Sequence, residues 1–359
     1  MAITALPSAA SASTVRIGGA NHVIYEAAPG ELNQVTISDA SQPNAFIVSD
    51  PGARIIPGPG CLLTSPSTAF CNGQLIGLVR EASIYLGDLS DTADNRSTSL
   101  TWGANLIGGD GNDRLYGGPY GDLLRGYGGD DLLDGRLGAD RIFGDDGRDR
   151  VTYVTRSQPV DVELDGIDND GQAGEYDFVY TDVEDLTGSQ AKDVLIGSDA
   201  NNSISGRGGN DYIDGRGGDD SMIGGIGADT LQGGDGAGDL ADYSGYTADV
   251  QVAMDLEAND GSSGEGDNVR GTEVVRSGSG NDKLFGGGGN NTLIGGAGND
   301  ALIGNGGSDA LYGQTGNDQL FARDGLRDIL SCSDGTDSAV TDSLDAMIGD
   351  GGCESVYRG

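Results

Sequence analysis

A nine-residue period runs through most of this chain and constrains its fold more than any other feature. The cleanest unit, residues 108–116, reads Gly-Gly-Asp-Gly-Asn-Asp-Arg-Leu-Tyr. Glycine occupies positions one, two and four, aspartate occupies position six, and an apolar residue occupies position eight. A fixed period of this kind predicts a repeat architecture, in which each unit is one small structural element that buries its apolar side against its neighbours.

The period occurs in three blocks, residues 108–152, 188–241 and 277–321, which hold sixteen units. One unit, near the end of the second block, carries an extra residue that places Asp239 one step late. Position eight is almost always Leu, Ile, Val or Met. Because side chains alternate along a strand, positions seven to nine predict a short strand whose middle residue points into a narrow core.

The two segments between the blocks resemble each other at an offset of 90 residues. The first segment contains Tyr153, Val160, Val162, Leu164, Asp165, Asp170, Gly171, Glu175 and Asp177. The second contains Tyr243, Val250, Val252, Met254, Asp255, Asp260, Gly261, Glu265 and Asp267. We interpret both as β-turns that extend the repeat stack within one region, residues 108–321. The run Asp168-Asn169-Asp170-Gly171 hints at an acidic calcium loop of the EF-hand kind, but an ordinary acidic turn is the preferred interpretation because the EF-hand glutamate is missing.

The ends of the chain differ from the repeats. Residues 1–13 are interpreted as the remnant of an export signal or a flexible tail, because the small-x-small pattern of residues 10–12 suits a signal-peptidase site. Residues 14–107 contain short β-rich runs punctuated by Gly, Pro, Asn and Asp, which predict a β-rich N-terminal cap. Residues 322–359, where the period decays, are predicted to form a C-terminal cap.

The charge of the chain limits its partners. Asp and Glu number 57 against 20 Lys and Arg, which gives a formal net charge of -37. So negative a surface repels nucleic acid and anionic membranes and attracts cations. With 66 glycines and 36% apolar residues, the chain has large conformational entropy and little core. A charge-neutralising ligand is therefore expected to contribute to its stability.

The pattern Gly-Gly-x-Gly-x-Asp-x-apolar-x resembles the RTX, or haemolysin-type, calcium-binding nonapeptide repeat across residues 108–321. The resemblance implies an all-β fold, a right-handed parallel β-roll (β-solenoid), with the β-rich N-terminal cap and a disulfide-tied C-terminal cap. One nonapeptide then makes half a turn, so that residues 18 apart stack on the same edge. The resemblance also implies that each Ca²⁺ ion lies between one loop and the next loop on that edge.

The sixth positions are the candidate metal ligands, because a carboxylate beside tightly turned carbonyl groups suits the hard Ca²⁺ ion. Two of these positions hold asparagine, which offers an oxygen without a charge. The predicted ligands are Asp113, Asp122, Asp131, Asp140, Asp149, Asp193, Asn202, Asp211, Asp220, Asp229, Asp282, Asn291, Asp300, Asp309 and Asp318.

Stacked carboxylates make a metal-dependent fold the expected outcome. Two like charges ~5 Å apart at an effective dielectric constant near 20 repel by about 3 kcal/mol. Several such rows would exceed a net stability of about 5–15 kcal/mol unless divalent ions lay between them. We therefore expect multiple Ca²⁺ ions to bind as the chain folds. The alternative is a metal-free solenoid in which the aspartates serve only as turn formers.

The four cysteines favour an oxidising, extracellular setting, secreted or associated with the cell surface. Four cysteines allow three pairings. We favour Cys61 with Cys71 and Cys332 with Cys353, because the two pairs lie near opposite ends of the chain. No run of about 18 apolar residues predicts a transmembrane helix.

We expect no enzyme. The sequence holds neither an H-E-x-x-H nor a G-x-S-x-G motif, and its only histidine, His22, is predicted to be a surface residue. Amphipathic segments of a pore-forming toxin are not evident. The sequence thus predicts a secreted calcium-binding repeat protein that acts as a structural, surface or adhesive module with an unknown protein or cell-surface partner. The alternative is a calcium-stabilised extracellular hydrolase or a toxin accessory domain.

Overall fold

The computed structural model describes residues 12–19, 22–42, 44–72, 79–349 and 352–358. These residues contain β-strands, turns and bends, and no α-helix occurs among them. They divide into two compact units: residues 1–155 with 164–185, and residues 156–163 with 186–359. The predicted export-signal remnant, residues 1–13, lies outside the described residues except for its last two.

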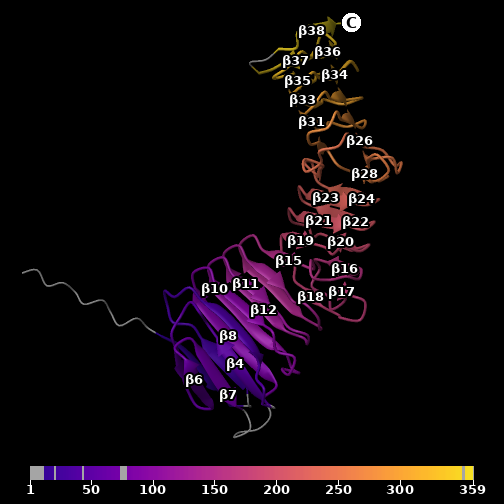
Figure 1. The fold of residues 1–359 in the computed structure, drawn as a ribbon. Coiled ribbons are helices and arrows are strands. Elements are labelled where there is room, and N and C mark those ends of the chain that lie inside the picture. Colours follow the sequence, from indigo (N-terminus) through magenta and orange to yellow (C-terminus); the bar gives the residue numbers. More distant parts are fainter. Residues whose placement is uncertain (1–11, 20–21, 43, 73–78, 350–351, 359) are drawn as a thin grey trace, which may run out of the picture. The chain divides into compact units, whose positions relative to one another are not determined.

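Unit 1 is built of short strands, most of which stack in parallel (Figure 1). Its strands are β1 (Ser13–Ile17), β2 (His22–Glu26), β3 (Gln34–Asp39), β4 (Ala45–Ser49), β5 (Ile55–Pro57), β6 (Cys61–Ser65), β7 (Thr68–Asn72), β8 (Glu81–Asp88), β9 (Thr92–Asn95), β10 (Ala104–Asp110), β11 (Arg114–Tyr116), β12 (Leu123–Gly128), β13 (Leu132–Asp134), β14 (Arg141–Asp146), β15 (Arg150–Thr152), β17 (Gly171–Gln172) and β18 (Phe178–Val179).

Two parallel ladders form the body of unit 1. One runs through β2, β8, β10, β12, β14 and β18, and the other through β3, β9, β11, β13 and β15. Within the repeats the register is 18 residues, as Leu106 opposite Leu124 and Leu124 opposite Ile142 illustrate. This register confirms the half-turn per nonapeptide that the resemblance implied.

The parallel stack extends toward the N-terminus beyond residue 108, where the first repeat block begins. Strands β2, β3, β8 and β9 of the segment predicted as a cap are themselves rungs of the two ladders. Antiparallel strands occur at its beginning, where β1 pairs with β2 and where β3, β4, β7 and β6 form a small antiparallel sheet. Cys61 and Cys71 form a disulfide between β6 and β7.

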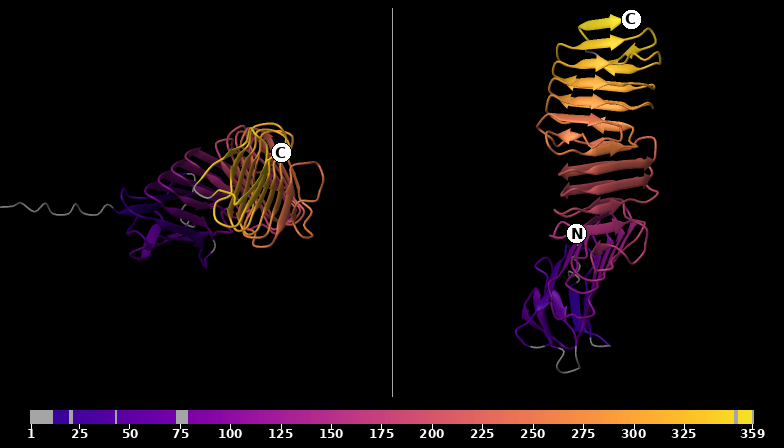
Figure 2. Two further views of the ribbon diagram at one scale, coloured as in Figure 1. Left: turned by 90° about the horizontal axis from the view of Figure 1, so that it is seen from above. Right: turned by 90° about the vertical axis from the view of Figure 1, so that its right-hand side faces the viewer.

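Unit 2 is built in the same way, and its rungs are seen in orange and yellow in the right-hand view of Figure 2. Its strands are β16 (Val160–Glu163), β20 (Val194–Ile196), β21 (Ser203–Gly208), β22 (Tyr212–Gly217), β23 (Ser221–Ile226), β24 (Thr230–Asp235), β25 (Leu240–Asp242), β26 (Val250–Ala253), β27 (Gly261–Ser262), β28 (Asn268–Arg270), β29 (Val274–Arg276), β30 (Lys283–Phe285), β31 (Thr292–Ala297), β32 (Ala301–Ile303), β33 (Ala310–Thr315), β34 (Gln319–Phe321), β35 (Ile329–Ser331), β36 (Ser338–Thr341), β37 (Ala346–Met347) and β38 (Ser355–Arg358). Strand β19 (Asp185–Thr187) spans the boundary between the units in the sequence.

Parallel pairing also dominates unit 2. One ladder runs from β21 through β23, β25, β29, β31, β33 and β35 to β37. The other edge carries β16, β20, β22, β24 and β28, and then β26, β30, β32, β34, β36 and β38. Cys332 and Cys353 form a disulfide near the C-terminal end of the unit, as predicted.

The core of each unit consists of columns of apolar side chains, each one residue wide and contributed by one ladder. The eighth-position side chains, such as Leu115, Leu133, Leu293 and Leu311, are at most 1% exposed. Each rung therefore places one apolar side chain directly against its equivalents on the neighbouring rungs. The structure thus confirms an all-β, parallel solenoid with two disulfides, which is the fold class predicted from the sequence.

Candidate metal sites in the repeat turns

The sixth-position carboxylates form hydrogen-bonded ladders along the edges of the stack. The backbone N–H of Asp113 donates to Oδ1 of Asp131 at 2.7 Å, and the N–H of Asp131 donates to Oδ1 of Asp149 at 2.9 Å. The same contact, at 2.7–2.9 Å, joins the pairs Asp122–Asp140, Asp193–Asp211, Asp211–Asp229, Asn202–Asp220, Asp282–Asp300, Asp300–Asp318 and Asn291–Asp309. The fold therefore brings together the aspartate pairs that the 18-residue spacing predicts.

The second carboxylate oxygen has no donor in most of these turns. It is buried, and no hydrogen bond from the described residues reaches it. This holds for Oδ2 of Asp113, Asp131, Asp149, Asp211, Asp220, Asp229, Asp300, Asp309 and Asp318. A buried carboxylate oxygen without a partner is costly unless a cation or a proton compensates it.

Burial also changes the acidity of these groups. Desolvation raises the pKa of Asp131, Asp149 and Asp211 to about 7, although a backbone N–H bound to each carboxylate opposes the shift. For Asp113, desolvation raises the pKa to about 6. The charge of Asp113 adds to the rise at Asp131. The carboxylate rows are therefore hard to keep ionised without positive charge nearby.

The first-position glycine is required by a close approach. A Cβ atom on Gly126 would lie under 3.0 Å from both Oδ2 of Asp131 and the carbonyl oxygen of Gly144. The same crowding between the first residue and the sixth-position side chain occurs at Gly108, Gly206, Gly215, Gly224, Gly295, Gly304 and Gly313. The missing side chain at position one of this turn therefore lets the Asp131 carboxylate and the Gly144 carbonyl oxygen both lie where a Cβ atom would be.

Within the repeat turns, positive φ occurs at the other two glycine positions and not at position one. Position two is left-handed in most turns, and position four is left-handed at, for example, Gly111, Gly129 and Gly147. A Cβ atom on Gly147 would meet the carbonyl of Gly129 on the preceding rung. Position four thus allows the loops to stack closely.

The donor set suits a hard cation. Among the described residues, no three side chains of His, Cys, Asp or Glu gather at one point. Side chains alone would therefore not complete the six or more oxygen ligands that Ca²⁺ prefers. The residues present fit the ion only if backbone carbonyl oxygens add to the carboxylates. The space beside the first-position glycine brings such a carbonyl close to the Oδ2 atoms of Asp113, Asp131, Asp211, Asp220 and Asp300.

An open cleft gives access to one row of these carboxylates. It has a volume of about 400 Å³ in unit 1 and is lined by Asn112, Asp113, Arg114, Asp130, Asp131, Leu132, Arg148, Arg150 and Asp185. Two of the arginines are already paired, because Arg148 and Arg150 contact Asp185 at 2.7 and 2.8 Å. Solvent and small ions can therefore reach the turns around Asp113 and Asp131.

The repeats match a known family. The RTX calcium-binding nonapeptide repeat (4 copies) matches residues 105–119, 116–151, 187–222, 214–237, 267–302 and 303–325. The chain carries RTX calcium-binding repeats. The matched residues fall in all three blocks, and a comparison with curated proteins finds no match.

Some predicted ligands depart from the common geometry of the RTX repeats. Asp122, Asp193, Asn202 and Asn291 each accept a backbone N–H from their own turn, and Asp122 and Asp193 also accept one from outside it. Oδ1 of Asp140 accepts the backbone N–H of Asp122, and Oδ1 of Asp282 accepts the backbone N–H of Val250. Whether each of the fifteen predicted residues binds metal stays a prediction.

Three residues outside the predicted set share the geometry of the open carboxylates. Asp239, Asp328 and Asp337 are buried, each accepts a sixth-position N–H through Oδ1, and each has an Oδ2 without a donor. They lie 19 residues after their partners because each rung contains one extra residue. The spacing Asp-x-apolar is retained, as in Asp328 and Leu330. A search for this shorter pattern alone would have identified these three residues in the sequence.

Proposed function

We propose that this protein is a secreted calcium-binding module whose β-roll folds as Ca²⁺ binds, and which serves a structural, surface or adhesive role. The observation that carries the proposal is the row of buried Oδ2 atoms without donors, because it repeats along the edges of both units. A divalent ion bound there would convert repulsion between stacked carboxylates into attraction. The RTX repeats supply the coarser conclusion of calcium binding.

Two further features support the extracellular part of the proposal. RTX repeats are typical of extracellular proteins, and both pairs of cysteines form disulfides, which persist in oxidising compartments. The described residues include no helix that could cross a membrane. The net charge of -37 supports a surface that collects cations rather than nucleic acid or anionic lipid.

We also propose that the module is not itself an enzyme. In the described part of the chain, the only histidine begins strand β2, and its Nδ1 lies 3.0 Å from the carbonyl oxygen of Gly19. A calcium-stabilised hydrolase or toxin accessory domain is the alternative. Attachment of a catalytic domain to this chain would favour it.

Circular dichroism during a calcium titration tests the proposal. We expect the chain in excess chelator to be largely disordered and to gain β-structure as Ca²⁺ is added. Mg²⁺ at the same concentration should give a much smaller change, because it demands stricter octahedral geometry and dehydrates reluctantly. A spectrum that is the same in chelator and in saturating Ca²⁺ would contradict the proposed coupling.

A further inference from the structure

The backbone of the second residue divides the repeat turns into two classes. In the first class this residue lies in the left-handed region, with φ between 61° and 117°. We call these the open turns. Their second residues are Gly109, Tyr127, Arg136, Asp145, Arg207, Arg216, Gly225, Gly234, Gly296, Asn305 and Gln314. Most of them are not glycine, so that this strained conformation is imposed by the turn.

In the second class the second residue is not left-handed, and its N–H points back into its own turn. Ser189 donates to Oδ2 of Asp193 at 2.6 Å, and Ser198 donates to Oδ1 of Asn202 at 2.7 Å. Gly287 donates in the same way to Asn291, and Gly118 to Asp122. We call these four the closed turns. The turn from Ser277 to Asp282 belongs to neither class, because Gly278 is not left-handed but Oδ2 of Asp282 lacks a well-formed hydrogen bond.

The two classes leave the sixth-position side chain in different states. In the closed turn at Asp193, Oδ2 accepts the N–H of Ser189, and Oδ1 accepts the Ser189 hydroxyl and the N–H of Val160. In the open turn that follows on the same edge, Oδ1 of Asp211 accepts one N–H, and Oδ2 accepts none. The protein itself therefore satisfies the closed carboxylate, whereas the open one still needs a cation.

The charges in the closed turns support this division. The two asparagines at sixth positions, Asn202 and Asn291, both lie in closed turns. An amide places no negative charge there, so no metal is needed to neutralise it. The Nδ2 of Asn305 also donates to the carbonyl oxygen of Gly286 in the second of these turns at 2.7 Å.

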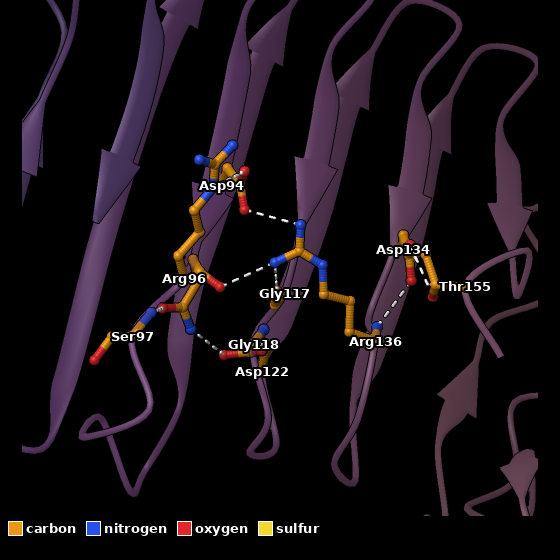
Figure 3. A network of polar contacts seen from close by, with 10 residues as sticks. Asp94, Arg96, Ser97, Gly117, Gly118, Asp122, Asp134, Arg136 and Thr155 are labelled. Atoms are coloured by element: carbon orange, nitrogen blue, oxygen red, sulfur yellow. Dashed lines mark hydrogen bonds and ion pairs between the residues drawn. The ribbon is translucent and has the colours of Figure 1, made fainter. Parts of the chain in front are cut away.

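Arg136 supplies a positive charge at the closed turn that contains Asp122 (Figure 3). Its Nη1 donates to the carbonyl oxygens of Gly117 and Asn95 at 2.8 and 3.1 Å, and its Nη2 lies 2.9 Å from Oδ1 of Asp94. Asn95 in turn donates through Nδ2 to Asp122. One guanidinium thus binds two backbone carbonyls and a carboxylate, a set of oxygens that would otherwise suit a metal ion.

We infer that the four closed turns bind no calcium, that Arg136 takes the place of an ion beside Asp122, and that the ions bind in the open turns. The inference rests on the proposed function. Each closed turn is the first nonapeptide turn on its edge within its block. The closed turns are therefore metal-independent bases on which the metal-dependent open turns stack.

Counting bound ions in full-length variants tests this inference. Asp122→Asn and Asp193→Asn change closed turns, and Asp131→Asn and Asp211→Asn are the matched changes in open turns on neighbouring rungs. By equilibrium dialysis against saturating Ca²⁺, the two closed-turn variants should bind as many ions as the parent chain. Each open-turn variant should bind at least one ion fewer. Circular dichroism in the same buffer verifies that each variant has folded.

The outcomes separate the inference from the proposed function. A parent chain that binds no Ca²⁺ would overturn the proposed function. A parent chain that binds Ca²⁺, with Asp122→Asn losing as many ions as Asp131→Asn, would overturn the inference alone. Arg136→Gln provides a second test that leaves the carboxylates intact. It should keep the parent ion count and lower the Tm more than Arg207→Gln, which changes the second residue of an open turn; equal Tm values for these two variants would count against the role of Arg136.

Discussion

The open turns of the repeats and the two inserted segments, residues 153–187 and 242–276, solve the same electrostatic problem differently. Both bury aspartates at the edge of a parallel stack. In open turns such as those of Asp131, Asp211 and Asp300, one oxygen of the carboxylate lacks a donor. In the inserted segments, tyrosine hydroxyls and backbone amides reach the equivalent aspartates.

The contacts in the first inserted segment show how this is done. Oδ2 of Asp177 accepts the hydroxyl of Tyr153 at 3.1 Å, and Oδ1 accepts the N–H of Asp140. Asp170 and Asp177 also exchange backbone hydrogen bonds in an isolated antiparallel bridge. The carboxylate is therefore held by protein groups on both oxygens.

The second inserted segment repeats this geometry. Oδ2 of Asp267 accepts the hydroxyl of Tyr243 at 2.9 Å, Oδ1 accepts the N–H of Asp229, and Asp260 bridges Asp267. The 90-residue duplication that the sequence indicates is thus a duplication of contacts. The difference from the repeats teaches that a tyrosine hydroxyl beside a stacked carboxylate supplies the hydrogen-bond donor that the open turns lack, and that a longer segment is needed to place it there.

The largest expected effect comes from filling the space beside an open-turn carboxylate. Gly126→Ala places a Cβ under 3.0 Å from Asp131 and from the Gly144 carbonyl, and should destabilise the calcium-loaded protein by about 3 kcal/mol. Gly264→Ala in the inserted segment is the control, since no atom lies within 4 Å and only its positive φ opposes a side chain. Thermal unfolding in saturating Ca²⁺ measures both. An equal fall in stability for the two variants would contradict the distinction between the open turns and the inserted segments.

Removal of a tyrosine hydroxyl tests the inserted segment directly. Tyr243→Phe leaves a buried oxygen of Asp267 without its donor and should destabilise the protein by about 2 kcal/mol. The number of bound Ca²⁺ ions should stay that of the parent, because the hydroxyl and not a metal satisfies this carboxylate. Tyr176→Phe, at an exposed position, should change neither quantity. Loss of an ion in Tyr243→Phe would show that the segment belongs with the open turns.

The smallest expected effect concerns a row of asparagine side chains that hydrogen-bond to one another from rung to rung. On the surface of the third block, Asn299 donates through Nδ2 to Asn281 at 2.9 Å and accepts from Asn317 at 3.1 Å. Asn299→Ala should destabilise the protein by about 1 kcal/mol. Ser308→Ala, at the same repeat position on the other edge, serves as control. A calcium-dependent loss in Asn299→Ala would contradict a purely neutral role.

Much of the fold follows from the nonapeptide period. The eighth-position apolar residues predicted the core column, and the 18-residue spacing predicted the register of Leu124 on Leu106. The sixth positions predicted which aspartates stack. These features are predictable because each nonapeptide has the same residue type at the same position, so that the structure of one unit predicts the structure of the next.

The remaining features depend on groups that the period does not contain. The rung formed by β8 and β9 escaped prediction because its register to the first repeat is 22 residues, as Ile84 opposite Leu106 shows. The division into open and closed turns depends on the φ of position two, where glycine occurs in both classes. The Arg136 side chain contacts the carbonyl oxygens of Gly117 and Asn95 on the two preceding rungs, and no local sequence motif predicts such a contact.

The stacking of the rungs has a mechanical consequence. Because each rung pairs chiefly with the rungs before and after it, the rungs of a unit share no common centre whose failure would release them together. A force applied along either unit would peel rungs away in sequence, each with a similar small extension. The force needed to begin unfolding would therefore be set by the least stable rung and not by the summed stability of all rungs.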